Sequence, residues 1–113
     1  MSTTGARQKI HDAVMSWPGV TASPHRFGGI EFRLGKRELG HVHGNELVDI
    51  PFPKKIRDEL VAADRVEPHH ILPGSGWVSF YLKGPSDVDL AIGLLRRSFD
   101  LAMKQWSHQS TGE

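Results

Sequence analysis

The sequence predicts an α+β fold, in which a single antiparallel sheet of about four to five strands carries helices packed on one face. The first observation is an alternation of apolar and polar residues between positions 30 and 50, broken twice by glycine-containing turn signals. The second is helical periodicity before this stretch and twice after it. The expected order of elements is α-β-β-β-α-β-α, and because helices and strands do not strictly alternate in it, the class is α+β.

The first helix is predicted over about Ala6 to Ser16, where apolar residues recur at the spacing of one helix face. Pro18 and Gly19 end it, because both residue types interrupt helices. A short extended piece is expected at Val20–Ser23. The predicted buried stripe of the helix consists of Ile10, Ala13, Val14 and Trp17.

A three-stranded meander is predicted next, with strands at Ile30–Leu34, Arg37–His43 and Glu46–Ile50. The dipeptides Gly35-Lys36 and Gly44-Asn45 are tight-turn signals between these strands.

The two turns predict the register of the meander, with Leu34 opposite Arg37 and His43 opposite Glu46. Directly paired residues share a face of a sheet, so His41 is expected among apolar side chains and Asp49 on the opposite face. A shift of one residue in either turn would invert part of this pattern. The face of His41 is expected to hold Ile30, Phe32, Leu34, Leu39, His43, Val48 and Ile50, and the other face Glu31, Arg33, Glu38, Val42, Leu47 and Asp49.

The second half of the chain is expected to contain a helix, a strand and a longer helix. Pro53 suits the first position of a helix that ends near Ala63-Asp64, and Glu67–Gly76 is predicted to be an irregular connection. The strand Trp77–Leu82 follows, and Ser86 is the expected N-cap of the last helix. Its apolar stripe is predicted as Val88, Ala91, Leu95, Phe99, Ala102, Met103 and Trp106.

Bulk composition is that of a globular protein and indicates one domain over residues 1–113, with its core at about 6–106. A formal net charge of +1, from 14 basic and 13 acidic residues, argues against nucleic acid as a partner. The absence of cysteine excludes disulfides, thiolate metal ligands and thiol catalysis. Neither a secretory signal nor a membrane-spanning run is apparent, which predicts a cytoplasmic protein. Oligomeric state stays open.

Four histidines in two pairs are the candidate catalytic residues: His41 with His43, and His69 with His70. Burial among apolar side chains would keep His41 neutral, so that it could take a proton from a phenol or an enol. Imidazoles also bind metal ions, and a metal site would use His41, His43 and His69. The alternative for His41 is a half-buried side chain bonded to backbone.

Candidate substrate-binding residues are Trp77, Arg57, Phe52 and Tyr81. Trp77 and Tyr81 share one face of the predicted fourth strand, and an exposed Trp77 would stack on a flat ligand. The alternative is that Trp77 packs in the core. The expected ligand is a small aromatic molecule.

Three segments resemble the luciferase-domain family, which includes small bacterial proteins and the luciferases of luminous fungi. They read HRFGGIEFRLGKRELGHVHG, DIPFPKKIRDELV and EPHHILPGSGWVSF, and the resemblance extends over about residues 7 to 104. A looser similarity is to small MmcQ/YjbR-type one-sheet proteins. Asp64 and Phe99 depart from the family pattern, which suggests Gly and Tyr there. Asp64 fits if its backbone is left-handed, a region that Asp tolerates.

The resemblance implies a ligand and a chemistry. Fungal luciferases oxidise a hydroxylated styryl-pyrone with molecular oxygen, without a flavin or a metal. It therefore implies binding of a planar phenol or enol, and its oxidation by O2 without a cofactor. The matching positions are His41, His43, Arg57, His69, His70 and Trp77. A non-catalytic protein-interaction module is the alternative, and a histidine-ligated metal enzyme is a further one.

Overall fold

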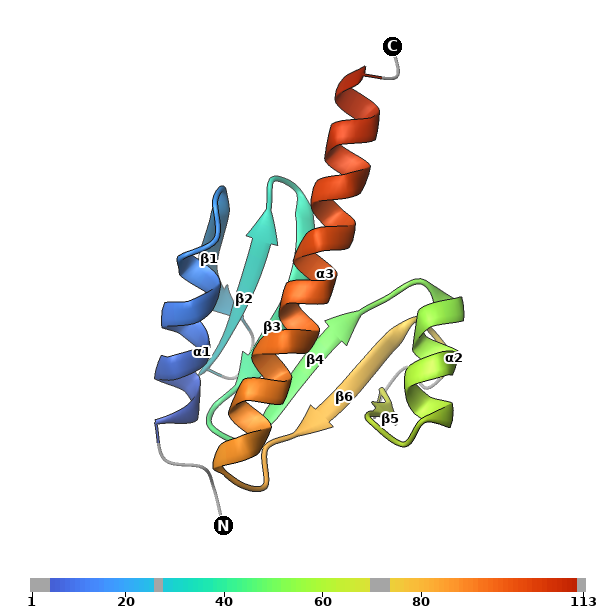
Figure 1. Ribbon diagram of the computed structural model, residues 1–113. Helices are drawn as coiled ribbons and strands as arrows, with labels where there is room; N and C mark the ends of the chain where they lie inside the picture. Colours follow the sequence, from blue (N-terminus) through green and yellow to red (C-terminus); the bar gives the residue numbers. More distant parts are fainter. Residues whose placement is uncertain (1–4, 26–27, 70–73, 112–113) are drawn as a thin grey trace.

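The computed structural model describes residues 5–25, 28–69 and 74–111. For residues 106–111 it describes the backbone alone. Within these ranges the chain forms a six-stranded antiparallel sheet and three helices, which confirms the predicted α+β class (Figure 1). The strand order across the sheet is β1-β2-β3-β4-β6-β5. The elements are α1 (Ala6–Met15), β1 (Val20–His25), β2 (Gly29–Leu34), β3 (Arg37–His43), β4 (Leu47–Pro51), α2 (Lys54–Ala62), β5 (Glu67–Pro68), β6 (Trp77–Tyr81) and α3 (Pro85–Thr111).

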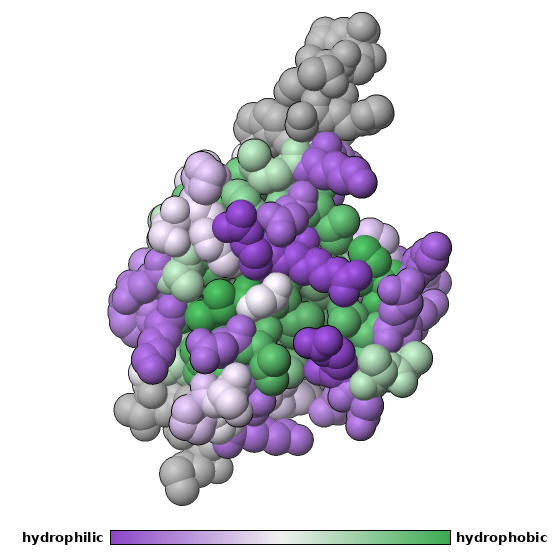
Figure 2. Space-filling view, viewed as in Figure 1, coloured by the Kyte–Doolittle hydropathy of each residue, from purple (hydrophilic) through white to green (hydrophobic). Residues whose placement is uncertain are grey.

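Helices α1 and α3 pack side by side against the same face of the sheet, as predicted, while α2 lies beside β5 at its far edge (Figure 1). Ile10 and Val14 of α1 and Leu95 of α3 are fully buried between these layers. Trp17 also packs in this layer, with its ring 5.4 Å from that of Phe99. Figure 2 shows hydrophilic residues on the outer sides of the helices and hydrophobic residues between them.

The register of the meander differs from the prediction, because β3 contains a bulge. Leu34 pairs with Arg37 as expected, but Phe32 pairs with Gly40 and Glu31 with His41. Leu39 is therefore the extra residue. Gly40 has a φ of 153°, and a Cβ on it would lie 2.7 Å from a Leu95 side-chain carbon and 2.9 Å from the backbone oxygen of Asp49. Only glycine fits so tight a position.

The second turn is also one residue longer than predicted. His43 pairs with Leu47 instead of Glu46, and His41 pairs with Asp49. The turn is closed by the bond from Glu46 N to His43 O (3.2 Å), and Gly44 adopts a φ of 55° in it. The expectation that His41 lies among apolar residues and that Asp49 lies on the opposite face is therefore wrong.

The remaining differences are local. The sheet gains a full strand at β1 and a two-residue strand, β5, in the connection expected to be irregular. Helix α3 already begins at Pro85, so Ser86 is not its N-cap, and Asp87 Oδ2 instead accepts a hydrogen bond from Lys83 N (2.8 Å). In the predicted stripe Met103 is exposed, and the side chain of Trp106 lies outside the described residues.

Two further expectations concerned the backbone at Asp64 and membrane-spanning segments. Asp64 has a φ of 60°, the left-handed backbone under which an aspartate fits this position. In the described part of the chain, no helix combines the length and apolarity that crossing a membrane requires.

Candidate functional site

The face of the sheet opposite the helices carries a row of polar side chains across five neighbouring strands. Register pairs His41 on β3 with Asp49 on β4, and Asp49 with Ser79 on β6. Since directly paired residues share a face, these side chains lie next to one another. From β2 to β5 the full row reads Glu31, His41, Asp49, Ser79 and Glu67.

The carboxylate of Asp49 is the centre of this row and is fully buried. Its Oδ2 lies 3.1 Å from His41 Nε2, 3.2 Å from His43 Nε2 and 3.4 Å from His69 Nε2. Its Oδ1 accepts a hydrogen bond of 2.7 Å from the hydroxyl of Ser79. The structure thus brings three of the four predicted catalytic histidines to one carboxylate that the sequence placed elsewhere. His70 lies outside the described residues.

His41 is held between two carboxylates. Its Nδ1 lies 2.7 Å from Glu38 Oε2, while its Nε2 faces Asp49. Burial alone lowers the pKa of His41, but the hydrogen bonds with Asp49 and Glu38 outweigh it and raise this pKa to about 9. The imidazole is therefore charged at neutral pH, and the expectation of a neutral His41 is wrong.

The pKa values of Asp49 and His43 are also shifted by their surroundings. Burial raises the pKa of Asp49, but hydrogen bonds from His41 and Ser79 outweigh it and hold the pKa well below its usual range. Burial and the positive charge of His41 lower the pKa of His43. His43 is also the most accessible of the three imidazoles, with a side chain 29% exposed against 9% for both His41 and His69.

Aromatic rings cover the charged centre. The ring of His25, at the end of β1, stacks on His41 at a centroid distance of 4.0 Å. The ring of Trp77 lies 5.2 Å from that of His41 and 5.9 Å from that of His69. We call this surface, formed by His25, His41, His43, Asp49, His69 and Trp77, the imidazole face.

Electrostatic partners extend the imidazole face to β2. His25 Nδ1 lies 2.9 Å from Glu31 Oε1, and Glu31 also accepts a hydrogen bond from Arg33 Nε. The bond with His25 lowers the pKa of Glu31, and Arg33 lowers it further. Burial acts in the opposite direction but is outweighed. Sequence reasoning missed His25 as a site residue, because its approach depends on how β1 pairs.

The predicted substrate-binding residues separate in the structure. Trp77 and Tyr81 project from the same face of β6 on either side of Ser79, and Tyr81 is exposed. Phe52 is buried in the core, which removes it from a ligand surface. Arg57 lies on α2, where its Nη1 donates a hydrogen bond of 2.6 Å to Asp58.

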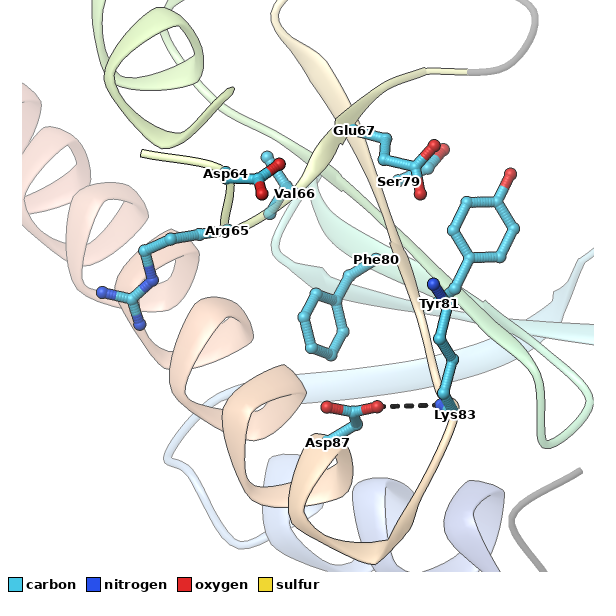
Figure 3. Close-up of a pocket in the computed structure, with 9 residues that line it drawn as sticks. All are labelled: Asp64, Arg65, Val66, Glu67, Ser79, Phe80, Tyr81, Lys83 and Asp87. Carbon is cyan, nitrogen blue, oxygen red and sulfur yellow. Dashed lines mark hydrogen bonds between the residues drawn. The ribbon is translucent and has the colours of Figure 1, made fainter. Parts of the chain in front are cut away.

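A groove of about 260 Å³ adjoins the imidazole face at the edge of β6. Within the described residues, β5 pairs only with Val78 and Ser79, so the groove opens where β6 continues beyond it. Figure 3 shows Ser79 and Tyr81 on one side of β6, with Phe80 pointing to the other. Ser79 both lines the groove and donates to Asp49, so it connects the two features.

Two groups of side chains in the described residues have the spacing of metal ligands. One is His25, His41 and His43, and the other is His41, Asp49 and His69, with one ligand atom per residue lying within 4.8 Å of the others in its group. Both groups share His41. Only the second contains a carboxylate.

Comparison with known proteins gave one match. A family model described as "Luciferase domain" matches residues 36–98, which is more than half of the chain. The matched span contains Asp49 and all three histidines around it, whereas His25 and Glu31 precede it. Comparisons with curated proteins and with solved structures gave no match.

Proposed function

Because the chain belongs to the luciferase-domain family, we propose that its imidazole face binds a planar phenol or enol and takes part in oxidising it with molecular oxygen. One observation carries this proposal. Three imidazoles surround a single buried carboxylate on the face opposite the helices, with aromatic rings beside them. Such a surface offers both stacking and proton transfer to a flat, weakly acidic molecule.

The aromatic residues of β6 supply the binding surface. Trp77 lies against His41 and His69, and a flat ring can extend this stack. Tyr81 lies opposite Leu47, which itself lies opposite His43, so these three residues form a second row on the same face. A substituent on the ligand can therefore continue from the imidazoles toward the groove beside Tyr81.

The proposed reaction begins with loss of the substrate O–H proton to His43, the imidazole that a ligand reaches first. The resulting enolate or phenolate gives two electrons from its electron-rich carbon to O2, and a carbon–oxygen bond forms. The oxygen is reduced to the level of a peroxide, which takes the proton back. General base catalysis of this type contributes about 10²–10⁴ in rate.

The test is a thermal-shift screen of the untagged protein against hydroxy-pyrones, catechols and other flat phenols, run in air with oxygen uptake and light recorded. We expect a stabilising compound that is consumed with O2, and at least a 100-fold slower uptake in His43→Gln. The matched control is His11→Gln, because His11 lies on α1 with its ring 6.1 Å from that of Phe32, at the helical layer.

Two outcomes would overturn the proposal. One is a bound compound whose oxidation is as fast in His43→Gln as in the control. The other is a screen in which no compound stabilises the protein or consumes oxygen. The second outcome would favour the protein-interaction module, which light scattering over a range of protein concentrations and partner pull-downs would then test.

A further inference from the structure

We propose that His41, Asp49 and His69 bind one divalent first-row transition-metal ion. The Nε2 atoms of the two histidines lie 3.1 and 3.4 Å from Asp49 Oδ2, and one ligand atom of each residue lies within 4.8 Å of the others. Metal bonds of about 2.0–2.2 Å to nitrogen and oxygen place neighbouring ligand atoms about 3.0–3.5 Å apart. Both imidazole nitrogens already have this separation from Asp49 Oδ2.

The crowding of imidazoles around Asp49 Oδ2 fits a bound cation as well as hydrogen bonds. Three imidazole Nε2 atoms, those of His41, His43 and His69, converge on Asp49 Oδ2. A carboxylate oxygen has only about two lone-pair sites. A cation held by His41, His69 and Asp49 would be bound by all three side chains and would leave His43 to donate to Oδ2.

The outer partners of two ligands match those of metal sites. His41 turns its Nε2 toward Asp49 and its Nδ1 toward Glu38 Oε2, 2.7 Å away. The second oxygen of Asp49 accepts the hydroxyl of Ser79 at 2.7 Å. In metal centres a ligating histidine gives its other ring N–H to a carboxylate, and a ligating carboxylate is itself hydrogen-bonded.

The donor set indicates the class of ion. Two histidines and one carboxylate with open positions are the ligands of non-haem iron(II) oxygenases, and imidazoles also suit zinc, copper and nickel. Iron(II) is our first choice because the proposed function uses O2, and this choice alone rests on that function. The family resemblance implies chemistry without a metal, so the donor set departs from that expectation.

The experiment is anaerobic calorimetric titration of the untagged, chelator-treated full chain with Fe(II), Mn(II) and Zn(II). We expect one equivalent of at least one ion to bind, and at least a tenfold weaker affinity in Asp49→Asn and in His69→Gln. His11→Gln is the matched control and should bind as the wild type does. Circular dichroism of each variant without metal establishes that it is folded, and a variant that does not fold is replaced by His41→Gln.

The inference is wrong if none of the three ions binds, or if Asp49→Asn and His69→Gln bind as well as the control. Loss of binding in His25→Gln with retention in His69→Gln would also overturn it, because the ligands would then be His25, His41 and His43. Oxygen uptake that survives chelation, in a protein that binds none of the three ions, would refute the metal site but not the proposed function. A bound metal without oxidation of any phenol or enol would support the metal site and refute the proposed function.

Discussion

His41 and Asp49 face each other directly across β3 and β4, with His41 Nε2 3.1 Å from Asp49 Oδ2. This pairing depends on the three-residue turn after His43. A two-residue turn would put the two side chains on opposite faces of the sheet. One backbone residue therefore decides whether the imidazole face has a carboxylate at its centre.

Removing that carboxylate should destabilise the metal-free protein strongly. We expect Asp49→Ala to lower the free energy of unfolding by roughly 3 kcal/mol or more, because His41 would keep a buried charge with one of its partners missing. Urea unfolding in the presence of a chelator measures this. The control is Asp58→Ala, which removes an exposed carboxylate paired with Arg57 and should cost less than about 1 kcal/mol. Equal losses in the two variants would contradict the assigned role.

The bulge at Gly40 should tolerate no side chain. We expect Gly40→Ala to cost about 1–3 kcal/mol, because the new Cβ would lie 2.7 Å from a Leu95 side-chain carbon and 2.9 Å from Asp49 O. Gly93→Ala in α3 is the matched control, since a Cβ there meets no atom within 4 Å. That variant should gain about 0.5–1 kcal/mol from helix propensity. Thermal unfolding compares the two, and a neutral Gly40→Ala would refute the packing argument.

The ion pairs of Glu31 predict a pH dependence of stability. Its hydrogen bond with His25 lowers its folded-state pKa below the unfolded value of 4.5. The stabilisation is therefore present above pH 4.5 and is lost as the pH falls through the lower, folded-state pKa. We expect Glu31→Gln to be less stable than the wild type by roughly 1 kcal/mol at pH 6–7. The difference should shrink below pH 4.5 in chemical unfolding, and a difference that grows toward acid pH would be evidence against this pair.

Periodicity was enough to predict the α+β class and the positions of most helices and strands. The period of two in β2 and of 3.6 in α3 depends only on which residues contact the core. A separate observation, two pairs of histidines beside turns and prolines, predicted His41, His43, His69 and His70 as one group, since such histidines have no obvious role in a core.

The register could not be predicted, because it depends on contacts between distant residues. The bulge places Gly40 against Leu95, and no local pattern signals a contact over that separation. The bulge and the longer turn each shifted the predicted register by one residue, and the shift at the turn placed Asp49 on the face opposite His41. The order Val48-Asp49-Ile50, a carboxylate between two buried apolar residues, is the one signal that could have revealed it.

The polar row across the sheet also makes the site a late event in folding. Its members come from five different strands, and Ser79 bonds to Asp49 across 30 residues of chain. Contacts of such large sequence separation form slowly, because the loop-closure entropy must be overcome first. During refolding, helical signal should therefore return before any capacity to bind a ligand at Asp49. In a nascent chain the imidazole face stays incomplete until β6 has been synthesised and has paired with β4.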